Sequence, residues 1–402
     1  MISTVATPTD VTVISPPTPH RPGRLGAALW PEGDGPTVID IFAGGGGMSL
    51  GFRSAGYCVV AAVDKDPGAA TVYQKNAPEV AFIGPTRDKP DRGDVANITG
   101  NLLLEQAGIE PGTLGLLVGG PPCQGYSEIG RRRPNDARNT LYRHFVRLLE
   151  ELRPQAYLFE NVPGLTNMLD AEGNKVIDAL LASLKEAGYS ASLYIIDAAT
   201  YGIPQYRKRL FIVGSRDERP ITLTPGPCSR ECYVTVNDAI ADLPLSLDGA
   251  TAECHGLPYV GEPPSPYAKL LRGAERLALN SAPTNHTPTL QQRIADVPPG
   301  GVDTKTRHRR LESSKPAWTL RAGTRRRTTC RPIHPTAHRV ITVREAARLG
   351  SFPDDFWLPS GKAGAHMIIG NGVPPLLAHH LAIAIAEQLF HKSGCPSSKR
   401  HP

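Results

Sequence analysis

The sequence lacks several features that would place it in other classes of protein. Its 402 residues show no apolar run that we judge long enough to span a bilayer, and the first residues do not form a secretion signal. Its seven cysteines are odd in number and scattered, which argues against a disulfide framework. We find no internal repeat. We therefore expect a cytoplasmic globular protein that does not engage membranes.

No metal is expected at the catalytic site. One group of cysteine and histidine residues leaves a zinc site open as an alternative, although its spacing differs from the common zinc patterns. Its members are Cys228, Cys232, Cys254 and His255.

Positive charge is modest in total but clustered. The formal net charge is +6, and arginines gather in short runs at 131–133, 207–209, 307–310 and 325–327. Clustered arginine suits a polyanion better than a small neutral substrate. For any single cluster, a solvated surface is the competing interpretation.

Apolar strands and amphipathic helices alternate through much of the chain, which predicts a doubly wound α/β sheet. The pattern weakens after Ser215, where prolines become frequent, and clear helices return near Arg344. We therefore expect one α/β domain with a smaller inserted domain. The expected divisions are a disordered tail at 1–35, a catalytic and cofactor-binding domain at 36–215, an inserted domain at 216–340, completing helices at 341–392 and a polar tail at 393–402.

A glycine-rich loop follows the first predicted strand. The strand 38–42 leads into four glycines at 44–47 and then into a helix, which is typical of a nucleotide-type site. Asp64 ends the next strand about 20 residues later, where a carboxylate can accept from ribose hydroxyls. The chain lacks a Gly-Lys-Ser/Thr phosphate loop, so a nucleoside without a triphosphate is favoured.

A stiff cysteine loop follows the strand 116–118. In the segment GGPPCQGYS (119–127), two prolines precede Cys123 and the glycines leave room beside it. A cysteine at a strand exit can be a nucleophile once it is a thiolate, although a lone cysteine is more often a packing residue.

Two further polar segments should reach the same edge of the sheet. Glu160 ends the strand after the cysteine loop, where a buried carboxyl group can exchange a proton; a helix cap or salt-bridge partner is the simpler interpretation. In QYRKR (205–209), alternation places Gln205, Arg207 and Arg209 on one side, able to face an anionic or carbonyl group.

These motifs resemble those of the cytosine-5 DNA methyltransferase family, and they occur in the family's order. The matching segments are IDIFAGGGGMSLGFRSAG (39–56), VDKD (63–66), GDV (93–95), GGPPCQGYS (119–127), ENV (160–162), QYRKR (205–209), TVREAARLGSFPDDF (342–356) and IGNGVPP (369–375). The family's usual glutamate at the ribose position is Asp64 here. The resemblance covers most of 36–215 and 340–390.

The resemblance implies an S-adenosyl-L-methionine-dependent enzyme of the restriction-modification type that methylates a flipped cytosine in duplex DNA. It implies Cys123 as nucleophile, Glu160 as proton donor, and Arg209 with Arg207 as groups that hold the base and a phosphate. The implied cofactor residues are Phe42, Ala43, Gly44, Gly45, Gly47, Asp64, Asp94, Val95, Pro121, Leu141 and Asn371.

The resemblance also implies that sequence choice lies in the inserted domain, which would be a target-recognition domain. Thr319-Leu320 resembles a pair ahead of a recognition loop at 321–335, whose arginines favour a G·C-rich target or contact phosphates. The expected DNA-binding residues are Gln124, Ser127, Arg131, Arg132, Arg133, Gln205, Thr319, Arg321, Arg325, Arg326 and Arg327. We expect 125–140 to act as a mobile lid. A restriction endonuclease of the same specificity is a candidate partner, and a monomer is expected.

Three alternatives remain open. A tRNA cytosine methyltransferase would share the catalytic motifs, but the Cys-Phe-Thr motif of that branch is not found here. A non-catalytic DNA-binding relative would lack Cys123 or Glu160, and both are present. A nucleotide-dependent oxidoreductase would explain the glycine loop alone.

Overall fold

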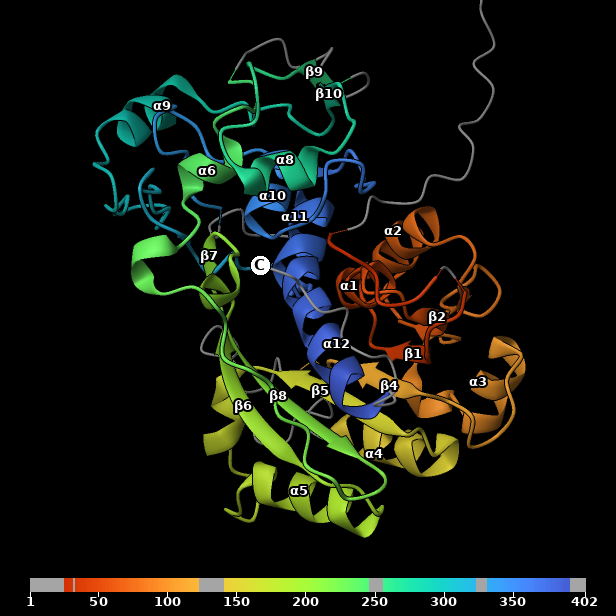
Figure 1. Cartoon of the computed structure of the whole chain (residues 1–402). Helices are drawn as coiled ribbons and strands as arrows, with labels where there is room; N and C mark the ends of the chain where they lie inside the picture. Colours follow the sequence, from red (N-terminus) through yellow and green to blue (C-terminus); the bar gives the residue numbers. More distant parts are fainter. Residues whose placement is uncertain (1–24, 32, 123–140, 246–255, 323–330, 391–402) are drawn as a thin grey trace, which may run out of the picture.

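A seven-stranded sheet forms the centre of the larger half of the molecule (Figure 1). The computed structural model describes residues 25–31, 33–122, 141–245, 256–322 and 331–390. The strand order is β3-β2-β1-β4-β5-β8-β6. The strands are β1 (Thr37–Ile41), β2 (Cys58–Val63), β3 (Ala81–Ile83), β4 (Leu116–Gly119), β5 (Ala156–Asn161), β6 (Ser192–Asp197) and β8 (Lys208–Ser215).

The sheet is mixed rather than wholly parallel. Strands β1 to β5 pair in parallel, whereas β8 runs antiparallel to both of its neighbours. In this register Glu160 lies opposite Phe211 and Asn161 opposite Leu210. The end of β5 therefore lies beside the beginning of β8, and these two strands carry Glu160 and Arg209. The predicted α/β fold class is confirmed, with this antiparallel strand as an addition.

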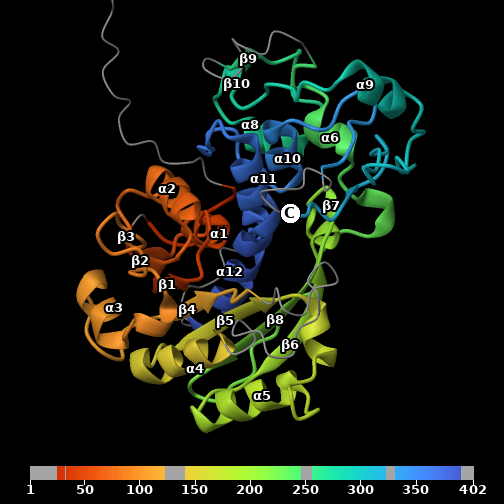
Figure 2. The ribbon, with the colours of Figure 1, turned by 180° about the vertical axis from the view of Figure 1, so that it is seen from behind.

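Helices cover both faces of the sheet, so its central strands are apolar on both sides. Along β1, Val38 packs into the core beneath one helical layer, whereas Ile39 packs into the core beneath the other. The first layer contains α1 (Gly47–Ser54), α2 (Pro67–Asn76) and α12 (Pro375–Leu389); the second contains α3 (Gly100–Ala107), α4 (Leu141–Leu152) and α5 (Val176–Glu186). Figure 2 shows α12 beside α1 from the opposite side.

The C-terminal helices are an integral part of this core. Residues 362–389, which include α11 (Lys362–Asn371) and α12, are long and apolar enough to cross a membrane by length and composition, contrary to our expectation. However, 78% of the apolar window is buried inside the protein. The Tyr57 hydroxyl also donates to the carbonyl of Ala382 in α12. Packing against the sheet half therefore explains the apolar character of this stretch.

The predicted disordered tail does not extend to residue 35. Leu25 is only 2% exposed, and its N–H donates to the Ser54 hydroxyl. The N–H of Leu29 donates to the carbonyl of Ala55. This segment packs on the end of α1 and is part of the fold from Leu25 onward. The predicted tails at 1–24 and 393–402 lie outside the described residues.

The described parts of the region 216–340, namely 216–245, 256–322 and 331–340, consist of short elements joined by irregular chain. They are η5 (Arg230–Cys232), α6 (Val236–Ile240), β9 (Leu257–Pro258), α8 (Pro266–Arg272), β10 (Leu277–Ala278), α9 (Pro288–Ala295) and β11 (Ala317–Trp318). Strand β11 pairs with β7 (Gln205–Tyr206), which comes just before β8 of the main sheet. Helix α10 (Val343–Leu349) follows the region and carries a capping box of Thr342 and Glu345.

Candidate active site

The glycine loop joins β1 to α1 at the carboxyl edge of the sheet. Gly44 and Gly46 have φ values of 57° and 90°, a region that favours glycine. The N–H of Gly44 donates to Asp64 Oδ2 at 2.8 Å, and Asp64 Oδ1 accepts from the N–H of Asp66 at 2.8 Å. Burial raises the pKa of Asp64, while these two hydrogen bonds oppose the rise. The predicted ribose acceptor is thus held against the loop.

Close backbone approaches bring two more segments to the same loop. A methyl group built on Gly93 would lie 2.1 Å from the carbonyl oxygen of Asp64, and one built on Gly47 would lie 2.4 Å from that of Val373. Only glycine permits contacts this short. They place Asp94 beside the end of β2 and the segment 371–373 beside the start of α1.

The predicted cofactor residues differ in their surroundings. Phe42 is half-buried with a φ of 60°, Asp94 caps η1 (Val95–Asn97) and pairs with Lys65 at 3.3 Å, and Asn371 is exposed at the end of α11. The buried members are Ala43, Gly45, Gly47, Val95, Pro121 and Leu141. A methyl group built on Gly44 would meet no atom within 4 Å, so space is open beside the Asp64 carboxylate. A carboxylate acceptor beside an open glycine backbone fits a nucleoside.

Glu160 and Arg209 form an ion pair at the ends of β5 and β8. Arg209 Nε lies 3.0 Å from Glu160 Oε1, and the two side chains are 15% and 12% exposed. Burial raises the pKa of Glu160, and the charges of Arg209 and Arg207 partly offset the rise. A carboxyl group in this setting takes up a proton more readily than one in water.

The same carboxyl group lies against the chain that leads to Cys123. A methyl group built on Gly120 would lie 2.8 Å from Glu160 Oε2. The side-chain amide of Asn161 donates to the carbonyl of Pro121 at 3.2 Å. The end of β5 therefore fixes both the acid and the approach to the cysteine loop.

Arg207 has partners different from those predicted. It is 1% exposed, and its guanidinium donates to the carbonyls of Leu320, Gly370 and Gly372 at 3.0 to 3.3 Å. Burial and the neighbouring Arg209 lower the pKa of Arg207 to about 9, so it stays protonated at neutral pH. Arg207 ties the sheet half to 320 and to the end of α11, which corrects the prediction that it holds the base.

Gln205 is also buried, at 1% exposure. Its amide nitrogen donates to the carbonyl of Leu349, and its amide oxygen accepts from the N–H of Leu320. With both ends occupied inside the protein, Gln205 positions the β7–β11 junction, and the predicted DNA contact is not supported. Alternation correctly grouped Gln205 with Arg207, but the shared side is the protein interior.

Of the other predicted DNA-binding residues, Thr319 and Arg321 lie at this junction. The Thr319 hydroxyl donates to the carbonyl of Tyr206 at 2.6 Å, and Arg321 is exposed. The remaining calls lie outside the described residues: Cys123, Gln124, Ser127, Arg131, Arg132, Arg133, Arg325, Arg326 and Arg327, the predicted lid at 125–140, and Cys254 and His255 of the alternative zinc site. Within the described residues, no three metal-binding side chains cluster.

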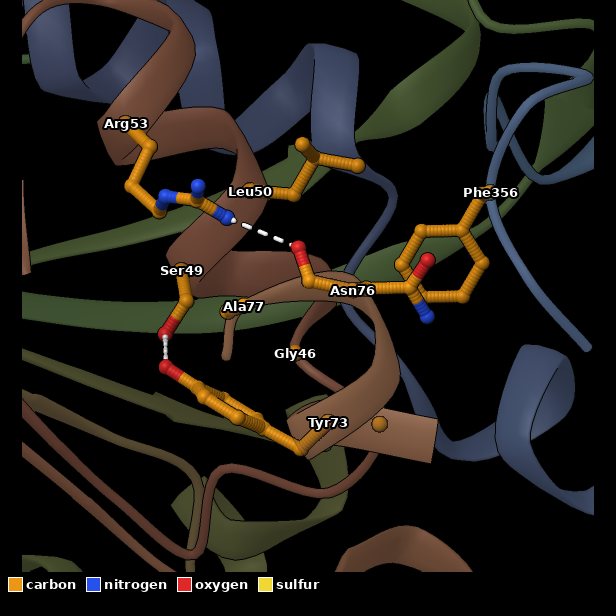
Figure 3. A pocket seen from close by; sticks show the side chains of 9 residues that line it. Gly46, Ser49, Leu50, Arg53, Tyr73, Asn76, Ala77 and Phe356 are labelled. Atoms are coloured by element: carbon orange, nitrogen blue, oxygen red, sulfur yellow. Dashed lines mark hydrogen bonds between the residues drawn. The ribbon is translucent and has the colours of Figure 1, made fainter. Parts of the chain in front are cut away.

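The sequence interpretation missed a polar group beneath the glycine loop. A small pocket there is lined by residues from the loop, α1 and α2 together with Phe356 (Figure 3). The Tyr73 hydroxyl donates to Ser49 inside this group (Figure 3). The available signal was Asp40, a carboxylate in an otherwise apolar strand.

Comparison with known proteins agrees with this geometry. A model of the C-5 cytosine-specific DNA methylase family matches residues 36–387. The Type II methyltransferase M.XorII of Xanthomonas oryzae is 37% identical over 90% of this chain and 87% of its own length. The Type II methyltransferase M.AgeI of Thalassovita gelatinovora is 30% identical over 87% and 98%.

A solved structure extends the likeness to three dimensions. It is described as a DNA modification methyltransferase encoded within a prophage (E. coli), and it aligns with a TM-score of 0.72 and 28% identity. The alignment covers 89% of this chain and all of that one. Sequence family, fold and the acid at the sheet edge thus agree: the chain belongs to the family of C-5 cytosine-specific DNA methylases and is a DNA cytosine-5 methyltransferase.

Proposed function

We propose that the chain transfers a methyl group from S-adenosyl-L-methionine to carbon 5 of a flipped cytosine within a specific duplex DNA site. The observation that carries the proposal is the Glu160–Arg209 pair, which lies against Gly120 on the approach to Cys123. The glycine loop, which holds Asp64 through the N–H of Gly44, follows β1, and β1 pairs with β4. The acid, the glycine loop and the segment 120–122 that leads to Cys123 therefore lie at one edge of the sheet, which supports the proposal.

The cofactor would be held by the chain's own residues around the glycine loop. Asp64 would accept from the ribose hydroxyls, with Asp94, Val95 and Asn371 as further contacts. When bound, S-adenosyl-L-methionine supplies the methyl group to be transferred. The open backbone at Gly44 and the half-buried Asp64 carboxylate support this assignment.

Cytosine carbon 5 is a weak nucleophile, so the chain must activate the ring. The thiolate of Cys123 would add to carbon 6, while Glu160 holds and protonates ring nitrogen 3. Arg209 orients the Glu160 carboxyl group and would contact the base carbonyl. After methylation, loss of the carbon 5 proton and departure of Cys123 restore the aromatic ring. Attack on carbon 6 requires access to the ring face, so the base must leave the helix stack.

The nucleophile can be tested by trapping. Duplex DNA that contains 5-fluorocytosine cannot lose a proton from carbon 5, so the wild-type protein should accumulate a covalent adduct only when S-adenosyl-L-methionine is present. Cys123→Ser should abolish both adduct and methyl transfer while still binding S-adenosylhomocysteine. Cys58→Ser is the matched control, since Cys58 lies in β2. Full activity of Cys123→Ser would contradict the mechanism.

The substrate is tested by competition between duplex DNA and tRNA as methyl acceptors. We expect transfer to DNA, and transfer to tRNA alone would overturn the DNA assignment. Bisulfite sequencing of DNA from a host that expresses the chain should reveal one methylated sequence.

We also propose that the chain is the cytoplasmic, monomeric modification enzyme of a restriction-modification system. The Type II methyltransferases among its relatives support this role. Protection of the methylated plasmid from an endonuclease specific for that sequence would test it; cleavage at fully methylated sites would contradict it.

A further inference from the structure

Three buried polar side chains form a continuous hydrogen-bonded chain beneath the glycine loop. The Tyr73 hydroxyl donates to Ser49 Oγ at 2.7 Å, and the Ser49 hydroxyl donates to Asp40 Oδ2 at 2.6 Å. Tyr73, Ser49 and Asp40 are 1%, 2% and 1% exposed. Buried polar chains of this kind are costly unless every member is satisfied, so their geometry is tightly determined.

These hydrogen bonds connect three elements that support the loop. Asp40 lies on β1 just before the loop, Ser49 lies in the first turn of α1, and Tyr73 lies on α2. The ring of Tyr73 packs directly beneath Gly46, where a methyl group would lie 3.0 Å from the ring. A shift of any member therefore moves the backbone of Gly44–Gly47.

Within the described residues Asp40 forms no ion pair, and the negative charge of Asp64 acts to raise the pKa of Asp40 further. Arg53 on α1 and Glu79 act on the Tyr73 end of the chain. Burial raises the pKa of Asp40 to about 7, while the Ser49 hydroxyl opposes the rise. Asp40 thus changes its charge near neutral pH.

The direction of the hydrogen bonds depends on that charge. Ionised Asp40 only accepts, so Ser49 must donate to it and Tyr73 must donate to Ser49. Protonated Asp40 can itself donate to Ser49, which leaves the Ser49 proton to compete for another acceptor. The ionised state therefore fixes one arrangement of the chain, and the protonated state allows more than one.

We infer that Asp40, Ser49 and Tyr73 are positioning residues that hold the glycine loop in its cofactor-binding form, and that ionisation of Asp40 strengthens cofactor binding. The inference rests on the proposed function, because it assigns the cofactor to this loop. None of the three residues needs to touch the cofactor or the base.

The test is calorimetric binding of S-adenosylhomocysteine between pH 5.5 and 8.5. This ligand lacks the sulfonium charge, so simple attraction to Asp40 is reduced. We expect wild-type affinity to rise with pH, with a midpoint near 7. Ser49→Ala removes the donor to the Asp40 carboxylate, and Tyr73→Phe removes the donor that fixes the direction of the Ser49 hydroxyl, so the midpoint should move upward in both variants. Loss of one hydrogen bond to a carboxylate corresponds to about one pH unit.

Tyr57→Phe is the matched control. Tyr57 is 4% exposed and donates one hydrogen bond, to the Ala382 carbonyl, but it is not hydrogen-bonded to Asp40, Ser49 or Tyr73. It should leave the midpoint unmoved, and Ser49→Thr, which keeps the hydroxyl, should restore the wild-type profile. Thermal unfolding verifies that each variant is folded at the temperature used.

Asp64 is the competing titrating group, because its pKa is also raised. Asp64→Asn should weaken binding at every pH but keep a midpoint. If Asp64→Asn abolishes the pH dependence of binding while Ser49→Ala and Tyr73→Phe leave its midpoint unchanged, the inferred role of Asp40, Ser49 and Tyr73 is overturned. The proposed function then stands. If the wild-type protein binds no S-adenosylhomocysteine at any pH, both the cofactor assignment and the inferred role of Asp40, Ser49 and Tyr73 fail.

Discussion

The two halves of this molecule are held together by different chemistry. The sheet half buries apolar side chains in two layers, and its backbone groups are satisfied by strand pairing. The half that contains 216–340 and α10 has only short strands. Five of the six buried arginines in the described chain lie between 310 and 348, and the sixth, Arg207, lies at the junction.

Arginine suits an irregular region because its five donors can satisfy carbonyls that have no strand partner. Arg310 shows this directly, since it donates to the carbonyls of Val297, His334 and Ile294 among others. Arg348 is 0% exposed and binds Asp354 and Asp242. The comparison teaches that proline-rich chain can be fixed by side-chain donors where sheet hydrogen bonds are missing.

The largest expected effect concerns the chemistry of the sheet half. If reactivity belongs to the sheet half, Glu160→Gln should lower the single-turnover methylation rate about 10²- to 10⁴-fold, because the amide cannot deliver a proton. S-adenosylhomocysteine binding should persist. Glu186→Gln, at an exposed position in α5, is the control and should match wild type. A Glu160→Gln methylation rate equal to that of the wild type would show that Glu160 does not deliver a proton in the reaction.

The next effect concerns stability of the arginine-held half. Arg348→Met removes the closest cation from the buried carboxylates of Asp354 and Asp242, which keep longer ion pairs with Arg344 at 3.7 Å and Arg272 at 3.8 Å, so the free energy of unfolding should fall by about 3–5 kcal/mol. Arg276→Met, at an exposed position, should change it by less than about 0.5 kcal/mol. Urea denaturation measures both. Phe159→Ala in the sheet core should cost about 3–5 kcal/mol through a cavity instead.

An equal free energy of unfolding in Arg348→Met and Arg276→Met would contradict this difference between the halves, because the buried ion pairs would then contribute no more than an exposed arginine. The loss of the Arg348 ion pairs should also be detectable locally, by proteolysis. Proteolysis within 216–340 should accelerate in Arg348→Met and remain unchanged in Arg276→Met.

A smaller effect is expected at the junction. Arg207→Lys keeps the charge but cannot reach carbonyls on both 320 and 370–372, so the free energy of unfolding should fall by about 1–3 kcal/mol. Single-turnover methylation by the folded variant should stay within a few-fold of wild type. If the rate collapses while stability is unchanged, Arg207 holds the base after all, and the correction made from its contacts is wrong.

The smallest effect is a difference in pH dependence between the halves. The pKa of Asp40 is raised by burial, so its contribution to stability is full below about pH 4 and is lost as pH rises to about 7. Burial acts to raise the pKa of Glu345, but Arg339 reverses this and lowers it, so that contribution is present above the ordinary pKa and is lost on acidification.

Stability measured against pH in two variants separates these contributions. Asp40→Asn should flatten the decline between about pH 4 and 7, whereas Glu345→Gln should flatten the loss on the acid side. Identical pH profiles for wild type and both variants would show that neither carboxyl group has a shifted pKa.

Local pattern was sufficient for most of the sheet half. Continuous apolar runs predicted β1, β2, β4 and β5, because these signals depend on residues that are near one another in sequence. The order of the motifs likewise identified the family. The antiparallel direction of β8 was not readable, since pairing direction depends on how distant strands meet.

Long-range contacts decided the roles of individual polar residues. Alternation grouped Gln205, Arg207 and Arg209, yet only Arg209 faces Glu160, because β7 leaves the main sheet to pair with β11. Arg207 binds carbonyls as far as 165 positions away. Such partners are brought together by the fold and leave no local periodicity.

Short segments of sequence were enough to identify the catalytic family, most strands of the sheet and the residue types available at its edge, because each is a local property. Only the folded molecule shows which arginine pairs with the acid, which arginine joins the two halves, and that Asp40, Ser49 and Tyr73 are hydrogen-bonded to one another under the loop. Burial and hydrogen-bond partners depend on segments that meet only after folding.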